Sequence, residues 1–181
     1  LYYRLTKFMA LLDILIYPDQ RLHKKAAPVE KVDAQIQTLI DDMFETMVQY
    51  EGIGLAAPQV ARSEQVVVME CDGDESIPNT VLINPKIVFY GPTQSEMWEG
   101  CLSIDNMRGK VMRPSMVRVQ AYDRQGVLQD IEANGLYAVC IQHEMDHLIG
   151  KLFIDRMVDM STLTQLGEFD AYWKKESATV I

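Results

Sequence analysis

Hydrophobic positions recur with a helical period in one segment of the N-terminal third of the chain. After Asp33, apolar side chains repeat three and four residues apart: Ile36, Leu39, Ile40, Met43, Phe44 and Met47. This spacing gathers them on one face of a helix. Asp33 is a residue type that caps a helix N-terminus. The pattern therefore predicts a helix that begins after Asp33 and ends before Gly52.

Short runs rich in Val, Ile and Tyr occupy the middle of the chain, separated by Gly, Pro, Asn and Asp. Three of them are expected to be strands: residues 65–69, 80–83 and 87–90. Apolar and polar side chains alternate over residues 116–122, and a turn at 123–126 would return the chain as a hairpin partner over 127–132. Strands in the middle and helices towards both ends predict the α+β class.

A second helix is predicted between Asn134, which can cap its start, and Gly150, which can end it. One stripe of this helix mixes apolar and polar residues: Leu136, Val139, Cys140, His143, Glu144 and His147. A second stripe is wholly apolar: Ile141, Met145 and Leu148. A helix that is apolar on two sides is central and buried. Imidazoles and a carboxylate buried there need a bound partner, because burying them unpaired is costly.

The polar residues of this helix form an H-E-x-x-H motif, HEMDH at 143–147. Residues four apart lie one turn apart on the same face, so both imidazoles can bind one ion. Glu144 would lie beside that ion as a base rather than a ligand. The alternative is a pair of histidines that only form hydrogen bonds in a core. The buried position of the helix favours metal binding over this alternative. The expected fold is a single domain of short mixed or antiparallel strands around a central metal-binding helix.

A catalytic ion needs a third protein ligand, and the chain offers three cysteines. Cys140 shares the helix stripe, but an ion held between the two histidines lies beyond its reach, so it is interpreted as a small core residue. Cys71 lies in a polar turn and is interpreted as an exposed loop thiol. Cys101 follows Gly100, which lets the backbone approach another group. Spacing alone makes Cys101 the best of three candidates and leaves open a loop cysteine without a special role.

A third segment, GIGLAAPQ at 52–59, is rich in small residues that allow close approach to a ligand, although ordinary tight packing explains it equally well. Together with EGCLS at 99–103 and QHEMDH at 142–147, it resembles the three signature motifs of the peptide deformylase family, in the same order and with similar spacing. The similarity extends from about Asp13 to Val158. The combination is far more specific than any one of the motifs.

The resemblance implies a metallo-hydrolase acting on a linear amide, which removes the N-formyl group from the N-terminal formyl-methionine of newly synthesised polypeptides and releases formate. It implies that Cys101 is the third metal ligand beside His143 and His147. It also implies Fe²⁺ as the ion in the cell, with Zn²⁺, Ni²⁺ or Co²⁺ as replacements in preparations. The expected partners are the N-termini of nascent polypeptides.

The resemblance also implies roles around the ion. Glu144 would move the proton, and the Gln59 side-chain amide and the Leu102 backbone N–H would surround the oxygen that gains charge. The peptide would pair like an added β-strand. The pocket for the methionine and its flanking backbone is expected at Ile53, Gly54, Leu136, Val139 and Cys140. Glu99 and Arg113 are expected to pair, either as a support for the site or as a solvated surface pair.

Composition narrows the partners and the compartment. The chain of 181 residues has 26 acidic and 17 basic side chains, a net charge of −9, which argues against specific nucleic-acid binding or an anionic membrane surface. No apolar stretch approaches the ~20 residues that span a bilayer. Three cysteines without a secretion signal favour reduced thiols and a cytoplasmic location.

The two ends of the chain carry separate expectations. Residues 1–8 are interpreted as a non-native extension, and residues 9–181 as the catalytic domain, with 161–181 as a C-terminal helical segment. A basic C-terminal helix docks some bacterial relatives on the ribosome. Here only Lys174 and Lys175 are basic, so a helix packed on its own domain is favoured over transient ribosome contact.

Two other functions compete with deformylation. The H-E-x-x-H motif also serves zinc peptidases, but these more often add a third histidine or a glutamate, and the one further histidine, His23, is expected at the surface. A non-catalytic metal-binding or peptide-binding protein is the other alternative. Glu144 and Gln59 argue against it, because a pure binder needs neither.

Overall fold

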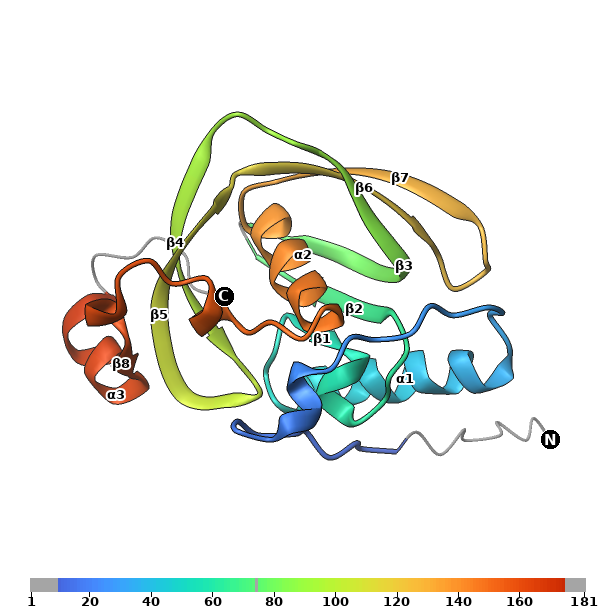
Figure 1. Cartoon of the computed structure of the whole chain (residues 1–181), viewed down its shortest axis with the longest axis horizontal. Coiled ribbons are helices and arrows are strands. Elements are labelled where there is room, and N and C mark those ends of the chain that lie inside the picture. Colours follow the sequence, from blue (N-terminus) through green and yellow to red (C-terminus); the bar gives the residue numbers. More distant parts are fainter. Residues whose placement is uncertain (1–9, 74, 175–181) are drawn as a thin grey trace.

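Two antiparallel sheets enclose a central helix in the computed structural model, which describes residues 10–73 and 75–174 (Figure 1). One sheet has the strand order β1-β2-β3-β6-β7 and the other β4-β5-β8. The strands are β1 (Gly54–Ala56), β2 (Val66–Cys71), β3 (Ile77–Tyr90), β4 (Gln94–Cys101), β5 (Ile104–Pro114), β6 (Met116–Tyr122), β7 (Leu128–Asn134) and β8 (Thr164–Gln165). The helices are α1 (Ala34–Gln49), α2 (Gly135–Leu148) and α3 (Leu166–Glu168). The predicted α+β class is confirmed.

Shorter helical turns connect these elements: η1 (Gln20–His23), η2 (Ala57–Val60), η3 (Phe153–Asp155), η4 (Met160–Thr162) and the π-helical η5 (Phe169–Trp173). The expectations for residues 1–8 and for Lys175 lie outside the described residues. No helix in the described part of the chain is long and apolar enough to cross a membrane.

Helix α1 forms where its periodicity predicts it. The Asp33 carboxylate accepts hydrogen bonds from the N–H groups of Gln35 and Ile36 at 2.9 and 3.1 Å, so the predicted cap is confirmed. The helix ends at Gln49, before Gly52. Its apolar face packs against β1 and β2 in a core cluster that includes Ile36, Leu39, Ile40, Met43, Met47, Leu55, Val66 and Val68.

The central strands follow the sequence pattern with one difference. Strand β6 covers residues 116–122 as predicted and forms a hairpin with β7. The two runs at 80–83 and 87–90 belong to one strand, β3, whose register shifts between Ile83 and Lys86. Asn84 has a φ of 53°, and its side chain hydrogen-bonds the backbone of Val29 at 2.7 and 2.8 Å. The break at Asn84 is therefore a local irregularity inside a continuous strand.

The β4–β5 hairpin was not predicted from the pattern. Its strands contain Gly100 and Gly109, and two of its charged residues, Glu99 and Arg113, are buried. Buried charges and glycines hide the alternation that normally marks a strand. This hairpin places Cys101, the candidate third ligand, at the end of β4 rather than in a loop.

Helix α2 contacts strands of both sheets and is largely buried, as its two apolar stripes predict. Asn134 occupies the N-cap position, but its side chain makes no capping hydrogen bond, so the expected side-chain cap is wrong. Gly150 follows the helix with a φ of 73°. A side chain there would collide with the backbone of His23, which explains the glycine.

The C-terminal segment is helical only in part. Residues 160–174 pass through η4, β8, α3 and η5 in place of one continuous helix. The helix does not start at residue 161 because Thr164 and Gln165 pair with β5 as a short strand. Phe169 is buried and Tyr172 is exposed.

Candidate metal centre

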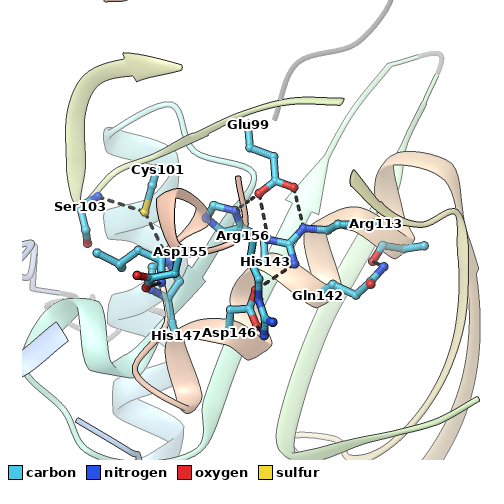
Figure 2. A network of polar contacts seen from close by, with 12 residues as sticks. Glu99, Cys101, Ser103, Arg113, Gln142, His143, Asp146, His147, Asp155 and Arg156 are labelled. Carbon is cyan, nitrogen blue, oxygen red and sulfur yellow. Dashed lines mark hydrogen bonds and ion pairs between the residues drawn. The ribbon is translucent and has the colours of Figure 1, made fainter. Parts of the chain in front are cut away.

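The potential ligands predicted from the sequence converge on one point between α2 and the end of β4. One ligand atom each from Cys101, His143 and His147 lies within 4.8 Å of the other two. Cys101 Sγ is 3.4 Å from His147 Nε2, and Figure 2 shows the Cys101 side chain directed at this imidazole. One thiol and two imidazoles are the N/S donors of a tetrahedral divalent-metal site. The donor set therefore fits a single ion with a position left open.

The two imidazoles are held differently. His143 Nδ1 bonds Glu99 Oε2 at 2.8 Å, which leaves Nε2 for the centre. Burial alone would lower the pKa of His143, but hydrogen bonds to Cys101 and Glu99 raise it well above the usual value. Cys101 and Glu99 therefore favour a cation bound to His143, either a proton or a metal ion. Burial lowers the pKa of His147 well below the usual value, so its imidazole is neutral, the form that binds metal.

Behind His143 lies a buried chain of charged groups, drawn in Figure 2. Arg113 donates to both oxygens of Glu99 at 2.6 and 3.0 Å, and to Asp146 at 2.9 Å. Arg156 also donates to Asp146, with one hydrogen bond to each carboxylate oxygen. Burial raises the pKa of Glu99, but hydrogen bonds with His143 and Arg113 outweigh it and hold the pKa at about 2. The expected Glu99–Arg113 pair is therefore buried and touches a predicted metal ligand.

Glu144 lies in α2 directly after His143 and is buried. Its burial raises the pKa of the carboxyl to about 7. Its Oε2 has no hydrogen-bond partner within the described residues. A Cβ on Gly54 would lie 2.5 Å from Glu144 Oε1, so only glycine lets β1 approach this carboxylate. The small residues of the 52–59 segment thus permit close approach of the backbone to the site.

Gln59 is fixed at the end of the same segment, in η2. Its Oε1 accepts a hydrogen bond from the Ala56 N–H at 2.8 Å, which orients the amide. Its Nε2 then faces Ser103 Oγ at 3.2 Å and Cys101 Sγ at 3.5 Å. Leu102 lies between β4 and β5, and its side chain packs so closely on Gly52 that a Cβ there would be 2.8 Å from Leu102 Cδ1. The Gln59 amide therefore contacts the Cys101 thiol, whereas the Leu102 side chain packs on Gly52.

A cleft of about 650 Å³ opens onto this centre. Cys101, His143, Glu144, Gln59 and Leu102 line it, together with Ile53 and Gly54 from the predicted pocket. The remaining predicted pocket residues lie in the buried core and do not line it: Leu136, Val139 and Cys140. Cys140 Sγ is 3.9 Å from the carbonyl oxygen of Ile53, which places the thiol behind the cleft wall.

Other candidates from the sequence lie apart from the centre. Cys71 is half-buried at the end of β2, and His23 is exposed; neither belongs to the ligand group found among the described residues. Conversely, sequence reasoning missed several residues that line the cleft: Ile14, Ile16, Tyr50, Glu51, Asp105, Asn106, Arg108, Leu166, Phe169, Asp170 and Lys174. They come from separate segments and carry no common motif that could have identified them.

Comparisons with a family model, with related proteins and with solved structures all match the same protein family. The family model described as polypeptide deformylase matches residues 11–162. The peptide deformylase of Saccharophagus degradans is 54% identical over 147 residues, which cover 81% of this chain and 85% of that protein. A crystal structure of a peptide deformylase from Synechococcus elongatus in complex with actinonin has 40% identity and a TM-score of 0.79, covering 93% of this chain and 87% of that one. A Met-Ala-Ser-bound class I type b peptide deformylase from Acinetobacter baumannii has 32% identity and a TM-score of 0.77, covering 82% and 99%.

Proposed function

The chain belongs to the polypeptide deformylase family, and from this premise we propose which of its residues carry the reaction. It is a metal-dependent hydrolase that removes the N-formyl group from the N-terminal formyl-methionine of nascent polypeptides. The observation that carries the residue assignment is the convergence of one thiol and two imidazoles beside a buried, unpartnered carboxylate.

Cys101, His143 and His147 are proposed to hold one divalent ion. A bound ion supplies Lewis-acid polarisation of the formyl group and lowers the pKa of water. We propose Fe²⁺ in the cell, with Zn²⁺, Ni²⁺ or Co²⁺ as replacements in preparations, because imidazole and thiolate ligands suit all of these ions. Metal analysis after anaerobic purification tests whether Fe²⁺ is the ion that the protein binds in the cell.

Glu144 is proposed as the acid/base. Its carboxylate takes a proton from the attacking water and delivers one to the amine that leaves as the new N-terminus. The support is positional, since Glu144 lines the cleft beside a ligand and its Oε2 is buried without a hydrogen-bond partner in the described residues.

Gln59 and Leu102 are proposed to stabilise the oxygen that becomes negative. The Gln59 amide is oriented before substrate arrives, because Oε1 is already bonded to the Ala56 N–H. The backbone N–H of Leu102, the residue that follows Cys101, is proposed as the second donor. One such preorganised donor is typically worth about 2.7–4 kcal/mol in the transition state.

The substrate backbone is proposed to pair with β1. Among the described strands, β1 lies at the end of its sheet and pairs with β2 alone, so its other edge can accept an added strand. Ile53 and Gly54, at the start of this edge, line the cleft. We propose that they contact the methionine directly. The other three predicted pocket residues lie in the core behind them and are not proposed to touch the substrate: Leu136, Val139 and Cys140.

Nascent polypeptide substrates suggest a cytoplasmic site of action, which we propose for this chain. Ribosome contact has little electrostatic support in residues 160–174. Their one basic residue, Lys174, pairs with Asp170 at 3.2 Å.

The Glu144→Gln variant tests the assignment. It should keep its ion, because Glu144 is not a ligand, and release formate from formyl-Met-Ala-Ser at least ~10²-fold more slowly. Glu132→Gln, at an exposed position of β7, is the matched control and should behave like the wild type. A Glu144→Gln enzyme of nearly full activity would refute the proposed base.

A further inference from the structure

The turn that follows α2 packs against the metal centre. We name residues 152–157 the post-helix turn, and this turn contains η3. Phe153 is 1% exposed, and its ring lies nearly parallel to the His143 imidazole, at an angle of 18° and a centroid distance of 6.4 Å. Gly109 of β5 leaves room for the turn, since a Cβ there would lie 2.6 Å from Met157 Sδ and 3.2 Å from Phe153 Cε2. The post-helix turn is therefore held beside a proposed metal ligand.

Arg156 extends from this turn back to α2. Its Nε donates to Asp146 Oδ2 at 3.0 Å, and its Nη2 donates to Asp146 Oδ1 at 2.5 Å. The Arg156 side chain is 44% exposed, whereas that of Asp146 is 8% exposed. A guanidinium that bonds both oxygens of a carboxylate fixes the geometry of the pair as well as balancing its charge. Arg156 is thus a partly exposed cation joined to a buried anion.

Asp146 connects Arg156 to His143 through the buried charged groups drawn in Figure 2. Its Oδ2 also accepts a hydrogen bond from Arg113 Nη1 at 2.9 Å. Arg113 donates to the two oxygens of Glu99 at 2.6 and 3.0 Å, and Glu99 Oε2 bonds His143 Nδ1 at 2.8 Å. The charges of the four residues before His143 alternate in sign and cancel. Without Arg156, two buried carboxylates would share one guanidinium.

The shared oxygen Asp146 Oδ2 links the position of Arg113 to the presence of Arg156. If Arg156 is removed, Arg113 is the one cation that still bonds Asp146 in the described part of the chain. A buried charge that loses a partner is strongly destabilised, so Arg113 is expected to move towards Asp146. This movement weakens its hydrogen bonds to Glu99, the group that orients His143.

We propose that Arg156 is a positioning residue for the metal centre: it shares Asp146 with Arg113, keeps Arg113 on Glu99, and so keeps the His143 imidazole directed at the ion. The inference rests on the proposed function only in taking His143 as a ligand. Arg156 is not among the residues that line the cleft, so its contribution concerns retention of the ion rather than binding of the peptide.

The affinity of the purified protein for Co²⁺, measured by competition with a chelator, tests this role. Arg156→Met should bind Co²⁺ about 3–10-fold more weakly, less than the 10–100-fold typical of a direct partner of a ligand, because Asp146, Arg113 and Glu99 intervene. Arg118→Met is the matched control. Arg118 also bonds both oxygens of a carboxylate, that of Asp130 at 2.6 and 2.9 Å, on the exposed face of β6 and β7. This control should bind Co²⁺ as the wild type does.

Three further measurements distinguish positioning through Asp146 from a general loss of stability. In an Asp146→Asn background, adding Arg156→Met should change the Co²⁺ affinity less than about twofold, because the charged connection is already lost. Arg156→Lys keeps the charge and should recover part of the affinity. With Co²⁺ at saturation, KM for formyl-Met-Ala-Ser in Arg156→Met should stay within about twofold of the wild type.

Specific results would contradict the proposed role of Arg156. These are a Co²⁺ affinity in Arg156→Met equal to that of Arg118→Met, an equal loss in the Asp146→Asn background, or a raised KM with unchanged metal affinity. If Asp146→Asn does not fold, the comparison of Arg156→Met with Arg118→Met decides alone. Formate release by the wild type tests the proposed function separately, because Co²⁺ affinity is measured without substrate.

Discussion

Replacing Arg113 by methionine removes the guanidinium on which two buried carboxylates depend. Arg113 donates two hydrogen bonds to Glu99, which is fully buried, and one to Asp146, whose side chain is 8% exposed. Methionine fills similar volume but leaves Glu99 with His143 alone. Breaking a buried ion pair by removing one partner typically costs about 3–5 kcal/mol. For a chain of this length, that corresponds to a fall in Tm of about 10 °C.

Thermal unfolding of the metal-loaded variant measures this cost, and Arg118→Met is its matched control. Arg118 pairs with Asp130 at 2.6 Å, with side chains 54% and 38% exposed, so solvent screens the pair and its loss should hardly change the Tm. Arg113→Met should also weaken metal binding by about 10–100-fold, because Glu99 orients His143. If Arg113→Met is no less stable than Arg118→Met, the buried network does not support the centre as described.

Two further predictions concern the shape of the site. In Gly54→Ala the new Cβ would lie 2.5 Å from Glu144 Oε1, so the carboxylate must move. Turnover should therefore fall by up to about 10²-fold, while the ion is retained. Gly167→Ala is the control and should leave turnover unchanged, because open space surrounds that glycine. Tight backbone at Gly52, Gly54 and Gly100 should exclude a methyl beside the reacting carbon, so kcat/KM for acetyl-Met-Ala-Ser should be at least ~10-fold below that for formyl-Met-Ala-Ser. Comparable rates for the two, or efficient cleavage inside an unblocked peptide, would favour a peptidase.

Local periodicity was enough to predict the elements that hold part of the centre. Helix α1 and strand β6 formed where a single repeating pattern placed them, because their buried faces are predominantly apolar. His143 and His147 could be paired from sequence alone, since one helical turn fixes their separation. Cys101 could be assigned only through resemblance, because its distance from the histidines depends on how β4 meets α2.

The parts that were missed depend on contacts between distant segments. The β4–β5 hairpin buries Glu99 and Arg113, so its pattern lacks the alternation of an ordinary strand. Arg108 and Asp170 come from distant segments, and both line the cleft in a fold where β8 pairs with β5. Leu136 and Val139 share the stripe of the histidines, yet they lie in the core, because a common helix face does not specify which part of it meets the cleft.

Metal analysis of five purified variants tests the central assignment most directly. Cys101→Ala, His143→Ala and His147→Ala should each lose the single ion expected at this centre. Cys71→Ala and Cys140→Ala remove the other two thiols and should keep about one ion per chain. Full metal content in Cys101→Ala, or loss of the ion from Cys140→Ala with the fold intact, would contradict a centre built from Cys101, His143 and His147.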